Sequence, residues 1–335
     1  MLRYTVFIFL LLFVACQTTI DEPFCDTPCI PEGFPSIVYP DSNEYTLARW
    51  ELGKRLFYEK RLSIDTTVSC GTCHQPQHFF TDNKRVSEGV FQRLGERNAP
   101  SLANIAYHPY YTREGGVPTL EMQILVPIQE HNEFNHNIVD IYQELGTDSS
   151  YQAMAQAAYG RALDPYVITR AIANFERTIL SGNSPYDQQF LQGQKNILTT
   201  KELAGKDLFF SDKTGCYHCH NDFDFTNYAF ANNGLYTNYQ DIGRMRVTAD
   251  SADLALFKVP SLRNVGQTAP YMHDGSMATL EDVINHYNDG GKAHPQKSSH
   301  IKPLHLSVEE KENIILFLHT LTDWSLTTNP DYHEN

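Results

Sequence analysis

The stretches CGTCH (residues 70–74) and CYHCH (residues 216–220) decide how this 335-residue chain folds. Each places two thiols three positions apart and a His directly after the second thiol. This pattern attaches a c-type haem covalently and supplies its proximal iron ligand. With 7 Cys and 14 His in the chain, chance would give roughly 0.006 such motifs. A zinc site built from two Cys pairs, or a redox dithiol, would not explain the two His.

The sequence therefore predicts two covalently bound haems and a chain organised around them. The residues expected to hold them are Cys70, Cys73 and His74 for the first haem and Cys216, Cys219 and His220 for the second.

The N-terminus predicts export. Residues 1–15 carry one basic residue followed by an apolar stretch that is too short to span a bilayer stably, as in a signal peptide. The small residue before Cys16 resembles a bacterial lipobox, although Phe13 replaces the usual Leu. Cleavage before Cys16 and lipidation of its thiol is our interpretation, and an ordinary secretory signal is the alternative. The mature protein would then lie in the periplasm or at the cell surface, held to a membrane only by this lipid.

Residues 16–40 are predicted to be a Pro-rich tether. Cys25 and Cys29 lie in it, and an oxidising compartment makes a small-loop disulfide between them plausible.

The composition excludes some classes of protein. Hydrophobic residues make up 41% of the chain, which is enough for packed cores. The formal charge of −14 argues against nucleic-acid binding, which normally needs a basic patch. The same charge predicts that a docking partner would be basic.

Helical patterns dominate the chain, and strand signals are weak. Asp164-Pro165 is an N-cap followed by Pro at the first helical position, and an apolar stripe at helical spacing follows it. Capping-box spacing marks three more helix starts, at Thr199/Glu202, Thr279/Asp282 and Ser307/Glu310. We predict an all-α fold of two cytochrome c-type domains with long loops and little β-structure, at residues 41–190 and 196–325.

The sixth iron ligand decides whether a haem carries electrons or reacts. Tyr287 falls on the apolar face of the helix that begins after Thr279, where a packed core Tyr is the simpler interpretation. Met272 and Met277 are the other candidate ligands, and periodicity does not choose among the three.

Between about Leu47 and Asp323 the sequence resembles the bacterial diheme cytochrome c peroxidases and the MauG-type proteins of methylamine utilisation. The stretches that carry the resemblance are LGKRLF (52–57), VSCGTCH (68–74), RNAPSL (97–102), VPSLRNV (259–265) and APYMHDG (269–275). It implies a peroxide-reacting haem in the N-terminal domain and an electron-storing haem in the C-terminal domain. It also implies Tyr287 as the sixth ligand of the second haem, because the peroxidases have Met there and MauG-like proteins have Tyr; Met272 is the runner-up.

The resemblance also implies the catalytic groups. Glu133 matches the family's distal acid/base and Gln123 its assistant, while Glu130 and His131 are the alternatives. Val90 stands where many peroxidases place a His that caps the resting N-terminal haem. Valine cannot ligate iron, so this haem is expected to stay open.

A calcium ion between the domains is usual in the family. The matching ligands are the Asn98 side chain and the backbone carbonyls of Thr268 and Pro270, which are the oxygen donors that calcium prefers. The resemblance gives His273 the task of orienting a haem propionate or the interface.

One departure concerns the route between the haems. Arg113 replaces a Trp that the family generally keeps there, and Arg cannot relay an electron. Transfer would need another route, such as Tyr110, Tyr111 or direct tunnelling.

The resemblance supports a peroxidase that reduces hydrogen peroxide with electrons from a small cytochrome c or cupredoxin. A MauG-like oxidase acting on a protein or small-molecule substrate is the second hypothesis. A non-catalytic diheme electron carrier or sensor, with both irons six-coordinate, is the third. By analogy with the family, two copies of the chain can form a homodimer.

Overall fold

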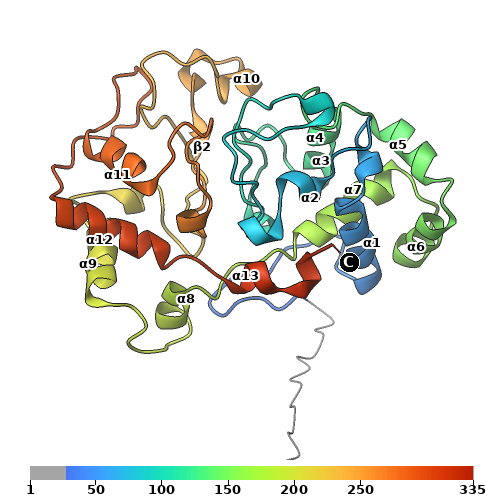
Figure 1. Cartoon of the computed structure of the whole chain (residues 1–335), viewed down its shortest axis with the longest axis horizontal. Coiled ribbons are helices and arrows are strands. Elements are labelled where there is room, and N and C mark those ends of the chain that lie inside the picture. The colour runs from blue at the N-terminus through green and yellow to red at the C-terminus, as the bar shows by residue number, and fades with distance from the viewer. Residues whose placement is uncertain (1–27, 335) are drawn as a thin grey trace, which may run out of the picture.

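The computed structural model describes residues 28–334, which form α-helices joined by long loops (Figure 1). Strands in this range are limited to β1 (Phe230–Ala231) and β2 (Phe257–Lys258), which pair antiparallel. The predicted fold class, mostly helical with little β-structure, is confirmed. The predicted signal peptide and Cys16 lie outside the described residues.

The helices are distributed along the whole described range. They are α1 (Leu47–Phe57), α2 (Cys70–Cys73), α3 (Leu120–Gln123), α4 (Leu125–Gln129), α5 (Ile138–Leu145), α6 (Ser149–Tyr159), α7 (Pro165–Glu176), α8 (Pro185–Phe190), α9 (Thr200–Phe209), α10 (Met245–Thr248), α11 (Leu280–Asn288), α12 (Val308–His319) and α13 (Ser325–Thr328).

The predicted helix starts are confirmed. The Asp164 side chain accepts a hydrogen bond from the Val167 backbone at the start of α7, with Pro165 at the first position. Complete capping boxes begin α9, α11 and α12, where the N-cap hydroxyl and the acidic residue three positions later satisfy each other's backbone N–H groups.

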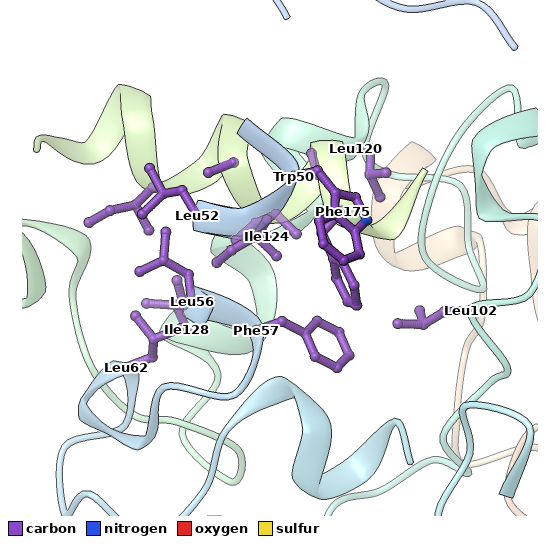
Figure 2. Packing of buried hydrophobic residues seen from close by; sticks show 14 of the residues in the cluster. Trp50, Leu52, Leu56, Phe57, Leu62, Leu102, Leu120, Ile124, Ile128 and Phe175 are labelled. Carbon is purple, nitrogen blue, oxygen red and sulfur yellow. The ribbon is translucent and has the colours of Figure 1, made fainter. Parts of the chain in front are cut away.

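Two hydrophobic clusters organise the described residues. The first contains the contact between α1 and α7. There Phe175 packs against Trp50 and Phe57, with ring centroids 5.9 Å and 5.1 Å away (Figure 2). The second surrounds α9 and α12, where Phe209 and Phe317 lie 5.2 Å apart. Truncating such a fully buried Phe to Ala typically costs about 3–5 kcal/mol.

The same helix crossing occurs in both clusters. A Cβ placed on Gly53 of α1 would lie 2.0 Å from the Ala171 carbonyl oxygen of α7. A Cβ on Gly205 of α9 would lie 1.9 Å from the Asn313 carbonyl oxygen of α12. Each helix pair therefore touches backbone to backbone, and glycine is the residue that permits this approach.

These crossings belong to an internal repeat. Residues 100–105 (PSLANI) and 260–265 (PSLRNV) occupy equivalent places, with Asn104 and Asn264 both at a φ of 61°. Isolated bridges pair Tyr111 with Val117 and Tyr271 with Met277, at the same offset of 160 residues. The shared Pro-Ser-Leu-x-Asn pattern is the signal in the sequence that marks this repeat.

The C-terminal segment returns to the first cluster. After α13, Tyr332 lies within that cluster, donates to the Thr178 carbonyl and accepts a hydrogen bond from Tyr58 on its own carbonyl. Figure 1 shows this end of the chain beside α1.

The domain boundaries at 41–190 and 196–325 stay a prediction. Among residues 28–334, none of the helices combines the length and the apolar character needed to cross a membrane.

Candidate haem sites and peroxide pocket

The first Cys-x-x-Cys-His motif presents its His for iron binding. Residues 70–73 form α2, whose start is held by a capping box between Ser69 and Thr72. His74 follows directly, and its Nδ1 lies 3.0 Å from the Phe80 carbonyl oxygen. This hydrogen bond places the proton on Nδ1 and leaves the Nε2 lone pair for a metal. Burial lowers the pKa of His74, which favours the neutral ring that a metal requires.

The second motif repeats this arrangement. Its first three residues form a 3₁₀ turn, Cys216–His218. Nδ1 of His220 lies 3.0 Å from the Phe225 carbonyl oxygen. Burial lowers the pKa of His220 to about 4.

Both motifs fit a covalent c-type haem. Cys70, Cys73, Cys216 and Cys219 are free thiols. Each pair of thiols precedes an imidazole whose second nitrogen is already held by the backbone, which is the donor set that a c-type haem needs. Across residues 28–334 no three His, Cys, Asp or Glu side chains converge on a common metal site, so the zinc interpretation gains no support.

The tether cysteines behave differently. Cys29 is disulfide-bonded. The predicted pairing of Cys29 with Cys25 concerns a residue outside the described range.

Glu133 lies close to the first motif. Its backbone carbonyl accepts a hydrogen bond of 2.9 Å from Val90 N, and Gly89 packs so tightly that an added Cβ would lie 2.6 Å from the same oxygen. The carboxylate is near enough to Cys70 and Cys73 to raise the pKa of both thiols, in addition to the larger effect of burial. The 89–90 backbone thus fixes an acidic residue beside the first haem site.

The surroundings of Glu133 change its acidity. Glu133 is an exposed residue. Nearby protein atoms still desolvate its carboxyl and raise the pKa from 4.5 to about 7, and the like charge of Glu130 adds to the rise. A group with this pKa is partly protonated at neutral pH, so it can both accept and donate a proton.

Gln123 supplies an unpaired polar atom. It ends α3, and its Oε1 is buried without a hydrogen-bond partner. Buried polar atoms normally have partners, so this oxygen is available to a bound molecule or water.

A pocket of about 370 Å³ opens beside the first motif. Its lining residues are Asp65, Thr67, Val68, Thr72, Lys84, Glu88, Gly89, Phe91 and Gln92.

At the position equivalent to Tyr287, the first half of the structure has a residue that cannot bind iron. Thr119 and Thr279 are equivalent N-caps. The same offset of 160 residues places Pro127 of α4 where α11 has Tyr287. Proline has no side-chain donor for iron, and neither has Val90, which is fully buried in the first cluster.

Tyr287 faces the second motif. Burial raises the pKa of its phenol to about 12, and the nearby Cys216 and Cys219 contribute to the rise. Tyr287 also hydrogen-bonds with Asn233.

Asn233 contacts the rival ligand as well. Its Nδ2 lies 3.2 Å from Met272 Sδ, and its carbonyl lies 2.9 Å from His286 Nε2. The sequence analysis missed Asn233 because no motif or periodic pattern marks it. In this arrangement the Met272 thioether is engaged by an amide.

The predicted calcium ligands do not fit a calcium ion. Asn98 Nδ2 donates to the Lys84 carbonyl, which leaves only Oδ1 as a side-chain ligand. Arg113 Nη2 lies 3.5 Å from that Oδ1 and donates to the Asn98 carbonyl at 2.7 Å. A calcium ion on Oδ1 would lie about 5 Å from this guanidinium, and at an effective dielectric of about 20 their repulsion is about 7 kcal/mol. The other two predicted ligands, the carbonyls of Thr268 and Pro270, are uncharged, and only the carboxylates of Glu114, Asp241 and Asp274 would offset part of this repulsion.

His273 packs at the same interface. Its ring stacks on Phe257 with centroids 4.2 Å apart, and its carbonyl accepts from Asn98 N at 3.0 Å. Burial lowers the pKa of this ring, which favours its neutral form.

Aromatic rings connect the two halves of the structure near Arg113. Tyr111 stacks on His108 with centroids 6.5 Å apart, and His108 contacts Tyr228 at 5.0 Å. Tyr110 stacks on Phe230 at 5.1 Å and donates its hydroxyl to the Tyr228 carbonyl. The structure thus brings both proposed relay tyrosines to the interface between the repeats.

Comparisons with known proteins identify the family of this chain. The family model for di-haem cytochrome c peroxidase matches residues 47–196. The methylamine utilization protein MauG of Methylorubrum extorquens is 33% identical over 290 residues, covering 85% of this chain and 81% of that protein. The chain belongs to the di-haem cytochrome c peroxidase and MauG family. Members of this family bind two c-type haems, as the paired motifs predict.

The relatives of this diheme protein divide between peroxidases and MauG. Cytochrome c551 peroxidase of Nitrosomonas europaea is also 33% identical, covering 81% of this chain and 79% of that protein. Among solved structures, a MauG-like protein associated with microbial copper homeostasis has a TM-score of 0.85 at 35% identity, covering 91% of this chain and 97% of that one. Similarity alone therefore does not choose between the two activities.

Proposed function

We propose that this diheme protein is a peroxidase that reduces hydrogen peroxide with electrons from a small redox protein. The observation that supports the proposal is the position of Glu133 beside the first motif, where its carbonyl accepts a hydrogen bond of 2.9 Å from Val90 N and its carboxyl raises the pKa of the Cys73 thiol. When bound, the haem on His74 would supply an iron with an open coordination position at which the peroxide O–O bond can break.

Glu133 and Gln123, which do not line the pocket described above, would transfer and orient the protons of the peroxide. As a carboxylate, Glu133 accepts the proton of the inner peroxide oxygen; as an acid, it returns that proton to the outer oxygen, which leaves as water. The buried Oε1 of Gln123 accepts a hydrogen bond that orients the peroxide or the product water. Overall, one peroxide, two protons and two electrons give two waters.

The proposal assigns the haem residues as follows. Cys70, Cys73 and His74 hold the peroxide-reacting haem, and Cys216, Cys219 and His220 hold the second. Tyr287 would supply a further iron ligand to this haem, a role supported by its proximity to Cys216 and Cys219. A phenolate favours ferric iron more than a thioether does, so this haem would store oxidising power and accept ordinary electrons poorly.

The electron donor and the location follow from charge and from the N-terminus. A formal charge of −14 suits a basic donor, so we propose a small basic cytochrome c or a cupredoxin. Export with a lipid on Cys16 would keep the enzyme near such donors.

A MauG-like oxidase is the second candidate. It is favoured by Tyr287 and by Arg113, which together make transfer from an ordinary donor less direct. In that case the stored oxidising equivalents would act on a protein or small-molecule substrate.

Stopped-flow mixing of the holoprotein with peroxide and reduced cytochrome c tests the proposal. Peroxide-dependent oxidation of the cytochrome over many turnovers supports the peroxidase. A long-lived oxidised state that does not react with reduced cytochrome c supports the MauG-like alternative. Two low-spin irons and no peroxide consumption would leave only an electron carrier or sensor.

A further inference from the structure

Arg113 joins the two halves of the structure at the place where a calcium ion was expected. Its Nη2 donates to the Asn98 carbonyl at 2.7 Å and lies 3.5 Å from Asn98 Oδ1. Asn98 in turn donates its backbone N–H to His273. From the other direction, the Lys258 backbone N–H donates to the Arg113 carbonyl at 2.7 Å. The backbone of Arg113 therefore crosses the seam between the repeats directly, and its guanidinium is linked to that seam through Asn98.

We propose that the positively charged guanidinium of Arg113 takes the place of a calcium ion at the seam between the repeats. This chain then holds its two halves together without calcium. A calcium ion gathers carbonyl and amide oxygens by offering them positive charge. The guanidinium offers the same charge with N–H donors in a fixed plane, and it already faces both oxygens of Asn98. The metal is then unnecessary and is repelled by the resident charge.

The surrounding charges keep Arg113 in its cationic form. Burial and the neighbouring Arg97 lower its pKa to about 10, which still leaves it charged at pH 7. Arg97 is itself compensated, because its Nη1 pairs with Glu114 at 2.6 Å and its Nε with Asp241 at 2.7 Å. Glu114, Asp241 and the more distant Asp274 favour the Arg113 charge.

The position of the head is also restricted. Arg113 Nε is buried without a hydrogen-bond partner, so the guanidinium does not reach solvent through that atom. In an arginine that lay on the protein surface, water would accept a hydrogen bond from this N–H group. Within the described residues, the hydrogen bonds of the guanidinium go to Asn98, a residue that is only 9% exposed.

Calcium content and thermal stability test this inference independently of peroxidase activity. We expect the holoprotein, after EGTA and gel filtration, to contain less than about 0.1 calcium per chain. Its Tm should not change between 1 mM EGTA and 1 mM CaCl₂. One retained calcium per chain, or a Tm that falls in EGTA, would overturn the proposal.

Variants of Arg113 test separately whether the charge or the volume of this side chain stabilises the protein. Arg113→Met keeps the aliphatic stem and removes the charge, so we expect a Tm loss of about 5 °C in EGTA that CaCl₂ reverses. Arg113→Lys keeps a charge and should stay insensitive to calcium. Arg85→Met is the matched control: Arg85 is an exposed seam residue whose Nε lies 3.3 Å from the Asp274 carbonyl. It should behave like the wild type.

Two outcomes of the variant experiment contradict the inference. If Arg113→Met is as stable as the wild type in EGTA, the guanidinium does not hold the seam. If its lower Tm does not respond to calcium, the two cations are not equivalent. Should Arg113→Met fail to fold, the calcium content of the wild type and the calcium response of Arg113→Lys still decide the question.

Discussion

Replacing Glu133 with Gln should remove a proton-transfer step and leave the fold intact. The pKa of about 7 means that the carboxylate fraction is about 10% at pH 6, about half at pH 7 and about 90% at pH 8. If the carboxylate begins peroxide cleavage, the second-order rate with peroxide should rise about ninefold between pH 6 and pH 8. Glu133→Gln should lose about 10²–10⁴-fold of this rate and the pH dependence together. Stopped-flow absorbance of the haem bands under excess peroxide measures both.

Glu130→Gln is the matched control for this prediction. Glu130 raises the pKa of Glu133 through its like charge, so its removal should move the midpoint of the profile to lower pH with little loss of the limiting rate. A flat profile between pH 6 and pH 8, or a Glu133→Gln rate within about threefold of the wild type, would refute the assignment.

The same carboxyl makes a prediction about stability. The folded state keeps this proton up to about pH 7, whereas an unperturbed Glu releases it near pH 4.5. Between these values the folded state binds more protons than the unfolded state, so the contribution of Glu133 to stability falls as pH rises. Glu133→Gln should therefore have a Tm at pH 8 that is equal to or above that of the wild type. A lower Tm would show that lost activity reflects damage to the fold.

Two further substitutions test the second half of the molecule. Tyr287→Phe should change the spin state and raise the reduction potential of the second haem, which EPR and redox titration measure. The control is Tyr271→Phe, which loses only a 2.9 Å hydrogen bond to the Val265 carbonyl and should leave the spectrum of that haem unchanged. Gly205→Ala forces a Cβ to 1.9 Å from a carbonyl oxygen of α12 and should destabilise the protein by about 1–3 kcal/mol in urea unfolding. Gly95→Ala, whose Cβ would meet nothing closer than 3.5 Å, should unfold like the wild type.

Features of this chain that depend on neighbouring residues were predictable from sequence. A capping box needs two residues three positions apart, and all three predicted boxes are formed. The haem motifs are equally local, because thiols and imidazole share one short turn. The mostly helical fold follows from the same short-range periodicity.

Contacts across loops were not predictable. Asn233 meets Met272 and Tyr287 only because three separate segments converge, and no spacing in the sequence encodes that. For Arg113, the sequence showed a departure from the family pattern but not its contact with Asn98, which is 15 positions away along irregular backbone. The calcium expectation did not include this contact: the three ligand residues are present, but the Arg113 guanidinium lies beside one of them, Asn98.

The internal repeat explains how one scaffold can provide two different irons. Both halves hold the proximal His through a backbone carbonyl at 3.0 Å, and both begin the opposing helical segment with a capping Thr. The halves diverge at one equivalent position, where Pro127 offers no ligand and Tyr287 offers a phenol. Replacing only this residue should therefore give the first haem iron a second protein ligand. In Pro127→Tyr, the first haem should gain low-spin character and lose its reactivity with peroxide, while the second haem is unchanged. If the first haem stays high-spin in a folded Pro127→Tyr variant, the openness of that site is set by the Glu133 loop and not by the missing ligand.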